Sequence, residues 1–195
     1  VNIEADMALV REALWQAGIG FLMAPRHHGA MRYVAPTRVE LGTRTIFNLL
    51  GPLSNPAGAK LQLIGVFDAI WMEPMAEVLR NLGSERVWVV HGRDGMDELT
   101  TTGPSEVVEL RGGELRRFEV SPEEAGLARA TLDDIRGGDG AENARVMTAM
   151  LDGAPGPVRD IVLLNAAGAL IVAGRAETLR DGVAKAAQAI DSGAA

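Results

Sequence analysis

The sequence predicts an α/β fold in which a mostly parallel central sheet is flanked by helices and carries one antiparallel hairpin. Residues 87–90 form a continuous apolar run, which is typical of a strand buried on both faces of a parallel sheet. Residues 71–82 precede it with apolar side chains at helical spacing, so a helix should pack beside that strand. From 106 to 120 the apolar period becomes two, and Gly112 and Gly113 interrupt it, a pattern that predicts a hairpin.

The N-terminal part is expected to hold two helices and a short strand. Asn2 or Asp6 can cap a first helix that ends near Gly18, because short polar side chains accept hydrogen bonds from free backbone N–H groups. Residues 20–25 are mostly apolar and end in proline, which predicts a short buried strand. A second helix is expected over residues 44–50.

The remaining elements complete the alternation of strands and helices. Residues 61–67 predict another strand, and Ser121-Pro122 followed by glutamates predicts a helix start. Helices are also expected over 140–150, over 158–173 and over 176–190, and the second of these is apolar on nearly all sides. No internal repeat or linker divides the chain, so one α/β domain is expected.

Composition excludes several classes of protein. The chain has 195 residues, 47% of them hydrophobic and 23% charged, which is ordinary for a globular domain. The net charge of −7 argues against a general nucleic-acid binder, which needs a basic face. There is no cysteine, so disulfides and thiolate metal sites are excluded. No apolar run is long enough to cross a bilayer and no signal-peptide pattern opens the chain, so a cytoplasmic protein without membrane association is expected.

Two adjacent acids follow the predicted buried strand. Asp97 and Glu98 come after residues 87–90, with Gly92 and Gly95 allowing the backbone to bend. Paired hard oxygen ligands suit Mg²⁺, which takes one or two carboxylates and completes its shell with water and phosphate oxygens. Ligands of open α/β sheets collect at the carboxyl ends of strands. The alternative is a pair of solvated acids in a turn.

Other polar residues are weaker candidates. Arg38 follows Pro36-Thr37 in an expected loop, where its planar guanidinium could receive an anion, whereas Arg44 can lie along a helix surface. His27 and His28 point in opposite directions on an extended chain, so a shared metal is not expected, and a ligand contact by one loop histidine is the better functional interpretation. Gly137-Gly138 before a helix could present N–H groups to an anion, although a plain turn explains it equally well.

Several motifs together resemble the anthranilate phosphoribosyltransferase family. The resemblance covers essentially the whole chain, in order and at natural spacing. It rests on residues 18–28, 38–56, 91–98, 137–144 and 164–167. The fold it implies is that of nucleoside phosphorylases and phosphoribosyltransferases of this type.

The resemblance implies a reaction and a set of site residues. Members of the family transfer phosphoribose from phosphoribosyl pyrophosphate (PRPP) to the amine of anthranilate, release pyrophosphate, act in tryptophan biosynthesis and depend on Mg²⁺. By resemblance, Asp97 and Glu98 hold Mg²⁺ at the pyrophosphate and Arg38 receives the anthranilate carboxylate. Pro25 and His28 line the channel by which anthranilate enters. No residue is assigned as a catalytic acid or base, and a homodimer is expected for the full-length protein.

The chain also departs from the family pattern. The glycine-rich Gly-Thr-Gly-Gly-Asp loop that cradles PRPP and the Lys-His-Gly-Asn segment do not occur in the sequence. Most of the small N-terminal helical domain is likewise absent. Residues 1–195 are therefore expected to be the larger α/β domain, truncated at both ends and inactive alone. Two alternatives remain: a non-catalytic binding protein of the same fold, some of which are thought to bind nucleic acid, and a nucleoside phosphorylase.

Overall fold

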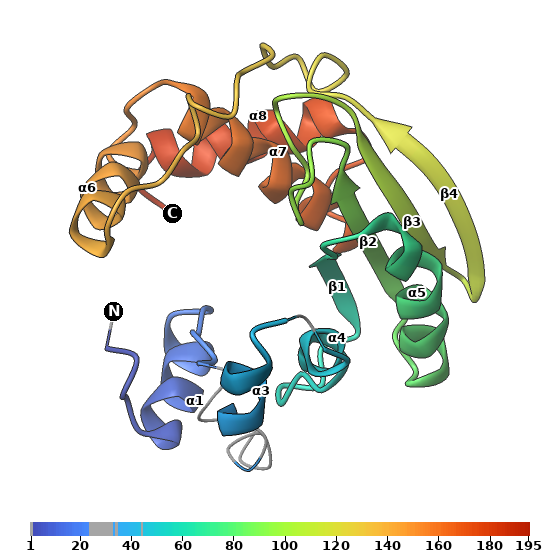
Figure 1. The fold of residues 1–195 in the computed structure, drawn as a ribbon. Coiled ribbons are helices and arrows are strands. Elements are labelled where there is room, and N and C mark those ends of the chain that lie inside the picture. Colours follow the sequence, from blue (N-terminus) through green and yellow to red (C-terminus); the bar gives the residue numbers. More distant parts are fainter. Residues whose placement is uncertain (1, 24–32, 34, 44) are drawn as a thin grey trace. The chain divides into compact units, whose positions relative to one another are not determined.

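The computed structural model describes residues 2–23, 33, 35–43 and 45–195, which form two compact units (Figure 1). The N-terminal unit spans Val1–Gly58 and the C-terminal unit spans Ala59–Ala195. No helix in the described part of the chain is both long and apolar enough to cross a membrane.

The described part of the N-terminal unit holds short helices. They are α1 (Met7–Gln16), α3 (Ala35–Leu41) and α4 (Phe47–Leu53). Asp6 caps α1 by accepting a hydrogen bond from the N–H of Ala8 at 2.8 Å, which confirms one of the two predicted caps. None of the described residues from 2 to 58 is buried. The hydrophobic core therefore lies in the C-terminal unit.

The short buried strand predicted over residues 20–25 is wrong where the structure describes it. Residues 20–23 form no strand, and Phe21 is exposed. Gly20 instead lies against α1, where a Cβ would come within 2.7 Å of Leu14 Cγ. Gly20 packs on α1 and Phe21 remains exposed, so the hydrophobicity of this segment did not indicate a place in a sheet.

The C-terminal unit holds a four-stranded sheet with the order β1-β2-β3-β4. Its strands are β1 (Leu61–Gly65), β2 (Arg86–Gly92), β3 (Ser105–Arg111) and β4 (Glu114–Val120). Its helices are η2 (Ala69–Trp71), α5 (Met72–Asn81), α6 (Gly140–Leu151), α7 (Pro157–Val172) and α8 (Leu179–Asp191).

The α/β class and the hairpin are confirmed, but the expectation of a mostly parallel sheet is wrong for the described strands. Only β1 and β2 pair in parallel, whereas β2–β3 and β3–β4 are antiparallel. Gly112 and Gly113 both have positive φ, 61° and 83°, as the two central residues of a type I′ turn require. The apolar run in β2 reports burial on both faces, and burial does not depend on the direction of the neighbouring strand.

Strand β2 is the centre of the core, with helices on both faces. Helix α5 contacts β2 and β3, and α7 contacts β1 and β2 (Figure 1). Trp88 and Val90 pack with residues of α7 such as Leu164, while Val87 and Val89 point to the opposite face because side chains alternate along a strand. Trp88 also meets Phe118 edge-to-face, with ring centroids 5.5 Å apart.

The helix predicted to start at Ser121-Pro122 is wrong, because the segment forms a turn. The N–H of Ala125 donates to the carbonyl of Pro122 at 3.1 Å, so one helical turn is made. Gly126 then adopts a positive φ of 80°, which ends the turn.

Helices α7 and α8 cross closely, and Gly182 permits the approach. A Cβ at position 182 would lie 2.6 Å from Ala167 Cβ and 2.7 Å from Ala167 Cα. Because Ala167 is fully buried and one of these atoms is backbone, α7 cannot accommodate a side chain at this position without a shift.

We expect Gly182→Ala to lower the free energy of unfolding of the chain by about 1–3 kcal/mol, the usual cost of overpacking a core. Gly140→Ala is the matched control, since a Cβ at that position would meet nothing within 4 Å. Urea denaturation followed by circular dichroism compares the two variants. Equal stabilities would show that the helix crossing is looser than described.

Candidate metal and substrate site

The candidate site is built on the loop that connects β2 to β3. This acidic loop, residues 93–104, contains Asp97 and Glu98 and follows the central buried strand as predicted. It turns immediately after β2: the N–H of Gly92 donates to the carbonyl of Met96 at 2.8 Å, and the N–H of Gly95 donates to the carbonyl of Gly92 at 2.9 Å. These hydrogen bonds fix the start of the loop backbone at the end of β2, the most buried strand of the sheet.

Asp94 organises the interior of the acidic loop. Its carboxylate accepts hydrogen bonds from the Thr100 hydroxyl at 2.6 Å, from the Thr102 hydroxyl and from the N–H of Met96 at 3.0 Å. Burial alone would raise the pKa of Asp94, but these hydrogen bonds outweigh it and hold the pKa below its ordinary value. In the sequence the only signal for this role is a weak one, namely an Asp-Gly pair followed by threonines.

Gly65 lets the acidic loop approach the end of β1. A Cβ at Gly65 would lie 1.4 Å from the carbonyl oxygen of Asp97 and 2.4 Å from its carbonyl carbon. The two backbones are therefore in direct contact, and only glycine fits at the last position of β1. This contact fixes the position of the Asp97 backbone from one side.

The amide of Asn165 fixes the same loop from the other side. Asn165 lies on α7; its Oδ1 accepts from the N–H of Leu99 at 3.0 Å and its Nδ2 donates to the carbonyl of Leu99 at 2.8 Å. Leu99 follows Glu98 directly and its side chain is fully buried. The sequence placed Asn165 in a motif but assigned it no role, because the contact spans 66 residues.

The two acids at the tip of this scaffold are exposed, and within the described residues their carboxylates have no ion-pair partner. Partial loss of solvent around the Glu98 carboxylate, with the negative charges of Asp97 and Asp94, raises the pKa of Glu98 above its ordinary value. Repulsion between these negative charges therefore lowers the free energy of unfolding of the loop's folded conformation. A bound cation would reduce this repulsion.

The donor set of the acidic loop fits Mg²⁺ but not a site made wholly of protein ligands. Among the described residues, no three His, Asp or Glu side chains are grouped so that they could hold a metal ion. Mg²⁺ is commonly bound by one or two carboxylates together with water and phosphate oxygens, so the pair Asp97 and Glu98 is sufficient for that mode.

The other predicted site residues are in the N-terminal unit. Pro25 and His28 lie outside the described residues, as do His27 and Arg44. The backbone of Arg38 lies in α3, so the expectation that it occupies a loop is wrong. Pro36, in the first turn of α3, favours the helix because its fixed φ suits that position and its missing N–H would have no helical partner there. The side chain of Arg38 is outside the described part.

The glycine pair before α6 forms a capped turn. Asp139 accepts from the N–H of Glu142 at 2.8 Å, and the N–H of Gly138 donates to Asn143 Oδ1 at 2.8 Å. Asn143 Nδ2 returns a hydrogen bond to the carbonyl of Gly138 at 3.2 Å. Since these N–H groups already have partners, the geometry supports the plain-turn interpretation over an anion site.

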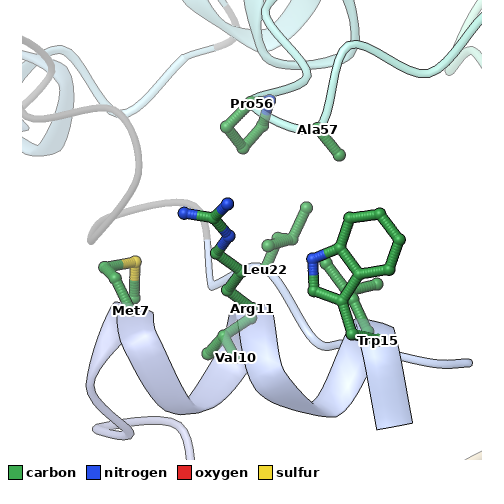
Figure 2. A pocket seen from close by; sticks show the side chains of 8 residues that line it. Met7, Val10, Arg11, Trp15, Leu22, Pro56 and Ala57 are labelled. Atoms are coloured by element: carbon green, nitrogen blue, oxygen red, sulfur yellow. The ribbon is translucent and has the colours of Figure 1, made fainter. Parts of the chain in front are cut away.

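An open hollow of about 570 Å³ lies in the N-terminal unit between α1 and the residues after α4 (Figure 2). It is lined by Met7, Val10, Arg11, Leu14, Trp15, Leu22, Pro56 and Ala57. Figure 2 shows the Arg11 guanidinium between the side chains of Met7 and Trp15. The acidic loop belongs to the other unit and does not contribute to this hollow.

Comparison with known proteins places the whole chain in one family. The model described as "Glycosyl transferase family, a/b domain" matches residues 1–195. An anthranilate phosphoribosyltransferase of Paramagnetospirillum magneticum is 64% identical over 195 residues, which are 100% of this chain and 56% of the relative. One of Rhodospirillum rubrum is 60% identical with the same coverage. The chain thus spans about half the length of the curated relatives it matches.

Solved structures agree with this placement. The chain is similar to anthranilate phosphoribosyltransferase from Thermus thermophilus, with a TM-score of 0.86 and 47% identity over 94% of this chain and 54% of that one. It is also similar to the Saccharomyces cerevisiae protein in complex with PRPP and Mg, with a TM-score of 0.87 and 28% identity over 97% of this chain and 55% of that one.

The raised pKa of Glu98 has a consequence for stability. Between the ordinary and the raised pKa the folded state binds more protons than the unfolded state, so this residue makes the free energy of unfolding fall as pH rises through that window. We expect Glu98→Gln to stabilise the chain at pH 7 in the absence of divalent cations. The gain should shrink below about pH 4, where the carboxyl group is protonated in both states.

The measurement is the urea midpoint of the wild-type chain and of Glu98→Gln at pH 7 and at pH 4. Glu114→Gln, an exposed glutamate at the start of β4, is the matched control and should change neither midpoint. A variant less stable than the wild type at pH 7 would contradict the electrostatic cost assigned to Glu98.

Proposed function

Because the chain belongs to the glycosyl transferase family whose a/b domain it matches from end to end, we propose that it is the α/β domain of an anthranilate phosphoribosyltransferase. The reaction proposed is transfer of phosphoribose from PRPP to the amine of anthranilate, a step of tryptophan biosynthesis. The observation that carries the proposal is the identity of 60–64% over all 195 residues to proteins of that name. The exposed acid pair at the end of β2 supports the same assignment.

The chemistry explains why an acid pair is useful in this place. The amine nitrogen forms a bond to C1 of the ribose, the C1–O bond breaks, and pyrophosphate leaves with the electron pair while the amine loses a proton. Asp97 and Glu98 would hold Mg²⁺, which neutralises the charge that gathers on the leaving pyrophosphate. The contacts of the acidic loop fix the backbone on either side of the two acids before substrate arrives, which reduces the reorganisation needed during the reaction.

The requirement for Mg²⁺ and PRPP is part of this proposal. It is supported by the yeast structure, which contains both, and by the donor set of the acidic loop. For anthranilate, we propose that Arg38 receives the carboxylate, since guanidinium binds carboxylates through paired hydrogen bonds. Pro25 and His28 are proposed to line the path of this substrate. A homodimer of the full-length protein is proposed from the family resemblance.

The alternative of a nucleic-acid-binding protein is less well supported. The net charge of −7 and the exposed acids at the end of β2 would repel a phosphate backbone in the absence of divalent cations. Such a protein would have no need to hold Asp94, Asp97 and Glu98 in one loop.

The test of the acid pair uses a chimeric full-length enzyme, the Paramagnetospirillum relative with its matched 195 residues replaced by this chain. We expect Asp97→Asn combined with Glu98→Gln to lower Mg²⁺-dependent turnover at least about 100-fold, the loss typical of removing a group that stabilises developing charge. Product formation from anthranilate and PRPP is measured by fluorescence. Glu114→Gln should leave turnover unchanged; retained activity in the double variant would reject the metal assignment.

The test of Arg38 uses the same chimeric enzyme. We expect Arg38→Ala to raise the KM for anthranilate about 10–100-fold, the equivalent of losing a charge-assisted hydrogen bond, and to change the KM for PRPP much less. Steady-state kinetics with each substrate varied separately gives both constants. Equal effects on the two substrates would rule out a specific role with the carboxylate.

A further inference from the structure

We propose that Asn165 is a positioning residue for the cation site: its amide fixes the backbone of the acidic loop in the conformation that presents Asp97 and Glu98 together. The inference rests on the proposed function for its metal and substrate. It assigns a role to a residue on α7 that does not itself carry a negative charge and lies far from the acids in sequence.

The first support is the geometry of the contact. Asn165 binds both backbone polar groups of Leu99, receiving the N–H at 3.0 Å and donating to the carbonyl at 2.8 Å. The N–H of Leu99 belongs to the peptide bond with Glu98, and the carbonyl belongs to the next peptide bond. One side chain therefore sets the orientation of two successive peptide planes, and the first of them determines where the Glu98 side chain begins.

The second support is that the amide has only one orientation that satisfies all its partners. Nδ2 also donates to the carbonyl of Ile161 at 2.9 Å, one turn earlier on α7. With both carbonyls facing Nδ2 and an N–H facing Oδ1, a flipped amide would oppose like dipoles at every contact. The hydrogen bond to Ile161, within α7 itself, thus fixes the rotamer of Asn165 independently of the loop.

The third support is that the loop backbone is contacted from two sides, by α7 and by β1. Leu99 is fully buried against α7, where a Cβ at Gly168 would come within 2.9 Å of its Cδ1. On the other side, the Asp97 carbonyl contacts Gly65 at the end of β1. The loop backbone is clamped between a strand and a helix, while the carboxylates remain exposed. Asn165 makes the side-chain hydrogen bonds of α7 to Leu99, the residue that follows Glu98.

A purely structural role would lower stability without changing cation binding, so the test separates the two. In the chimeric full-length enzyme, we expect Asn165→Ala to raise the Mg²⁺ concentration for half-maximal activity about 10–100-fold, the usual effect of removing a group that orients a metal ligand. The KM for PRPP should rise with it. Turnover at saturating Mg²⁺ and the KM for anthranilate should change less than about three-fold, because the acids and the anthranilate contacts are intact.

Asn165→Asp is measured beside it. This near-isosteric variant keeps the side-chain volume and can accept from the N–H of Leu99, but it cannot donate to the carbonyls of Leu99 and Ile161. Its carboxylate would face both carbonyl oxygens, so it should lose this loop contact at least as completely and show at least as large a shift in Mg²⁺ dependence as Asn165→Ala.

The matched control is Gln62→Ala. Gln62 also makes a partly buried amide hydrogen bond, from Nε2 to Ser84 Oγ at 3.1 Å, near the start of β1 and away from the acidic loop. It should lose a comparable interaction and leave the Mg²⁺ dependence unchanged. A shift as large in Gln62→Ala as in Asn165→Ala would overturn the proposal.

Two further readouts do not depend on activity. Binding of free Mn²⁺, followed by electron paramagnetic resonance, should weaken at least about ten-fold in Asn165→Ala. Hydrogen exchange of the Leu99 amide should accelerate more than that of Val89 in the core strand β2. Unchanged Mn²⁺ affinity, or unchanged exchange at Leu99, would overturn the positioning role. If the wild-type chimera made no product, the proposed function would fail, and Mn²⁺ affinity would still decide the role of Asn165.

Discussion

The burial of strand β2 on both faces is the constraint on which the rest of the structure depends. Val87, Val89 and Val90 are completely inaccessible to solvent, with α5 on one face and α7 on the other. A strand held in this way cannot slide, because a shift of one residue would exchange the side chains of the two faces. The acidic loop starts where this strand ends, so the most completely buried strand of the sheet carries the loop that contains Asp97 and Glu98.

Local chemistry made part of this arrangement predictable from the sequence. The Gly112-Gly113 turn, the Asp6 cap and the position of Asp97-Glu98 after a buried strand each depend on neighbouring residues, and the structure has all three. The pairing direction of the sheet was not accessible in this way, because an apolar run records only how deeply a strand is buried. The segment at residues 20–23 failed for a related reason: apolar side chains do not specify which partner will cover them.

The supporting residues of the site were hidden from sequence reasoning because their contacts are long-range. Asn165 meets Leu99 across 66 residues, and Gly65 meets Asp97 across the gap between β1 and the loop. An asparagine inside an apolar helix predicts only that some buried polar partner exists. Its identity depends on the way α7 packs on the sheet, which no pattern within α7 contains.

Because Gly65 has no side chain, the backbone at the end of β1 and the backbone of the acidic loop are in direct contact. Since the Asp97 carbonyl occupies the space that any Cβ would need, a movement of the β1 end must displace the loop backbone with it. A larger residue at position 65 would therefore displace the backbone of Asp97, although residue 65 itself belongs to the sheet. The residues tolerated around the acidic loop are thus limited by the space that its backbone occupies as well as by charge.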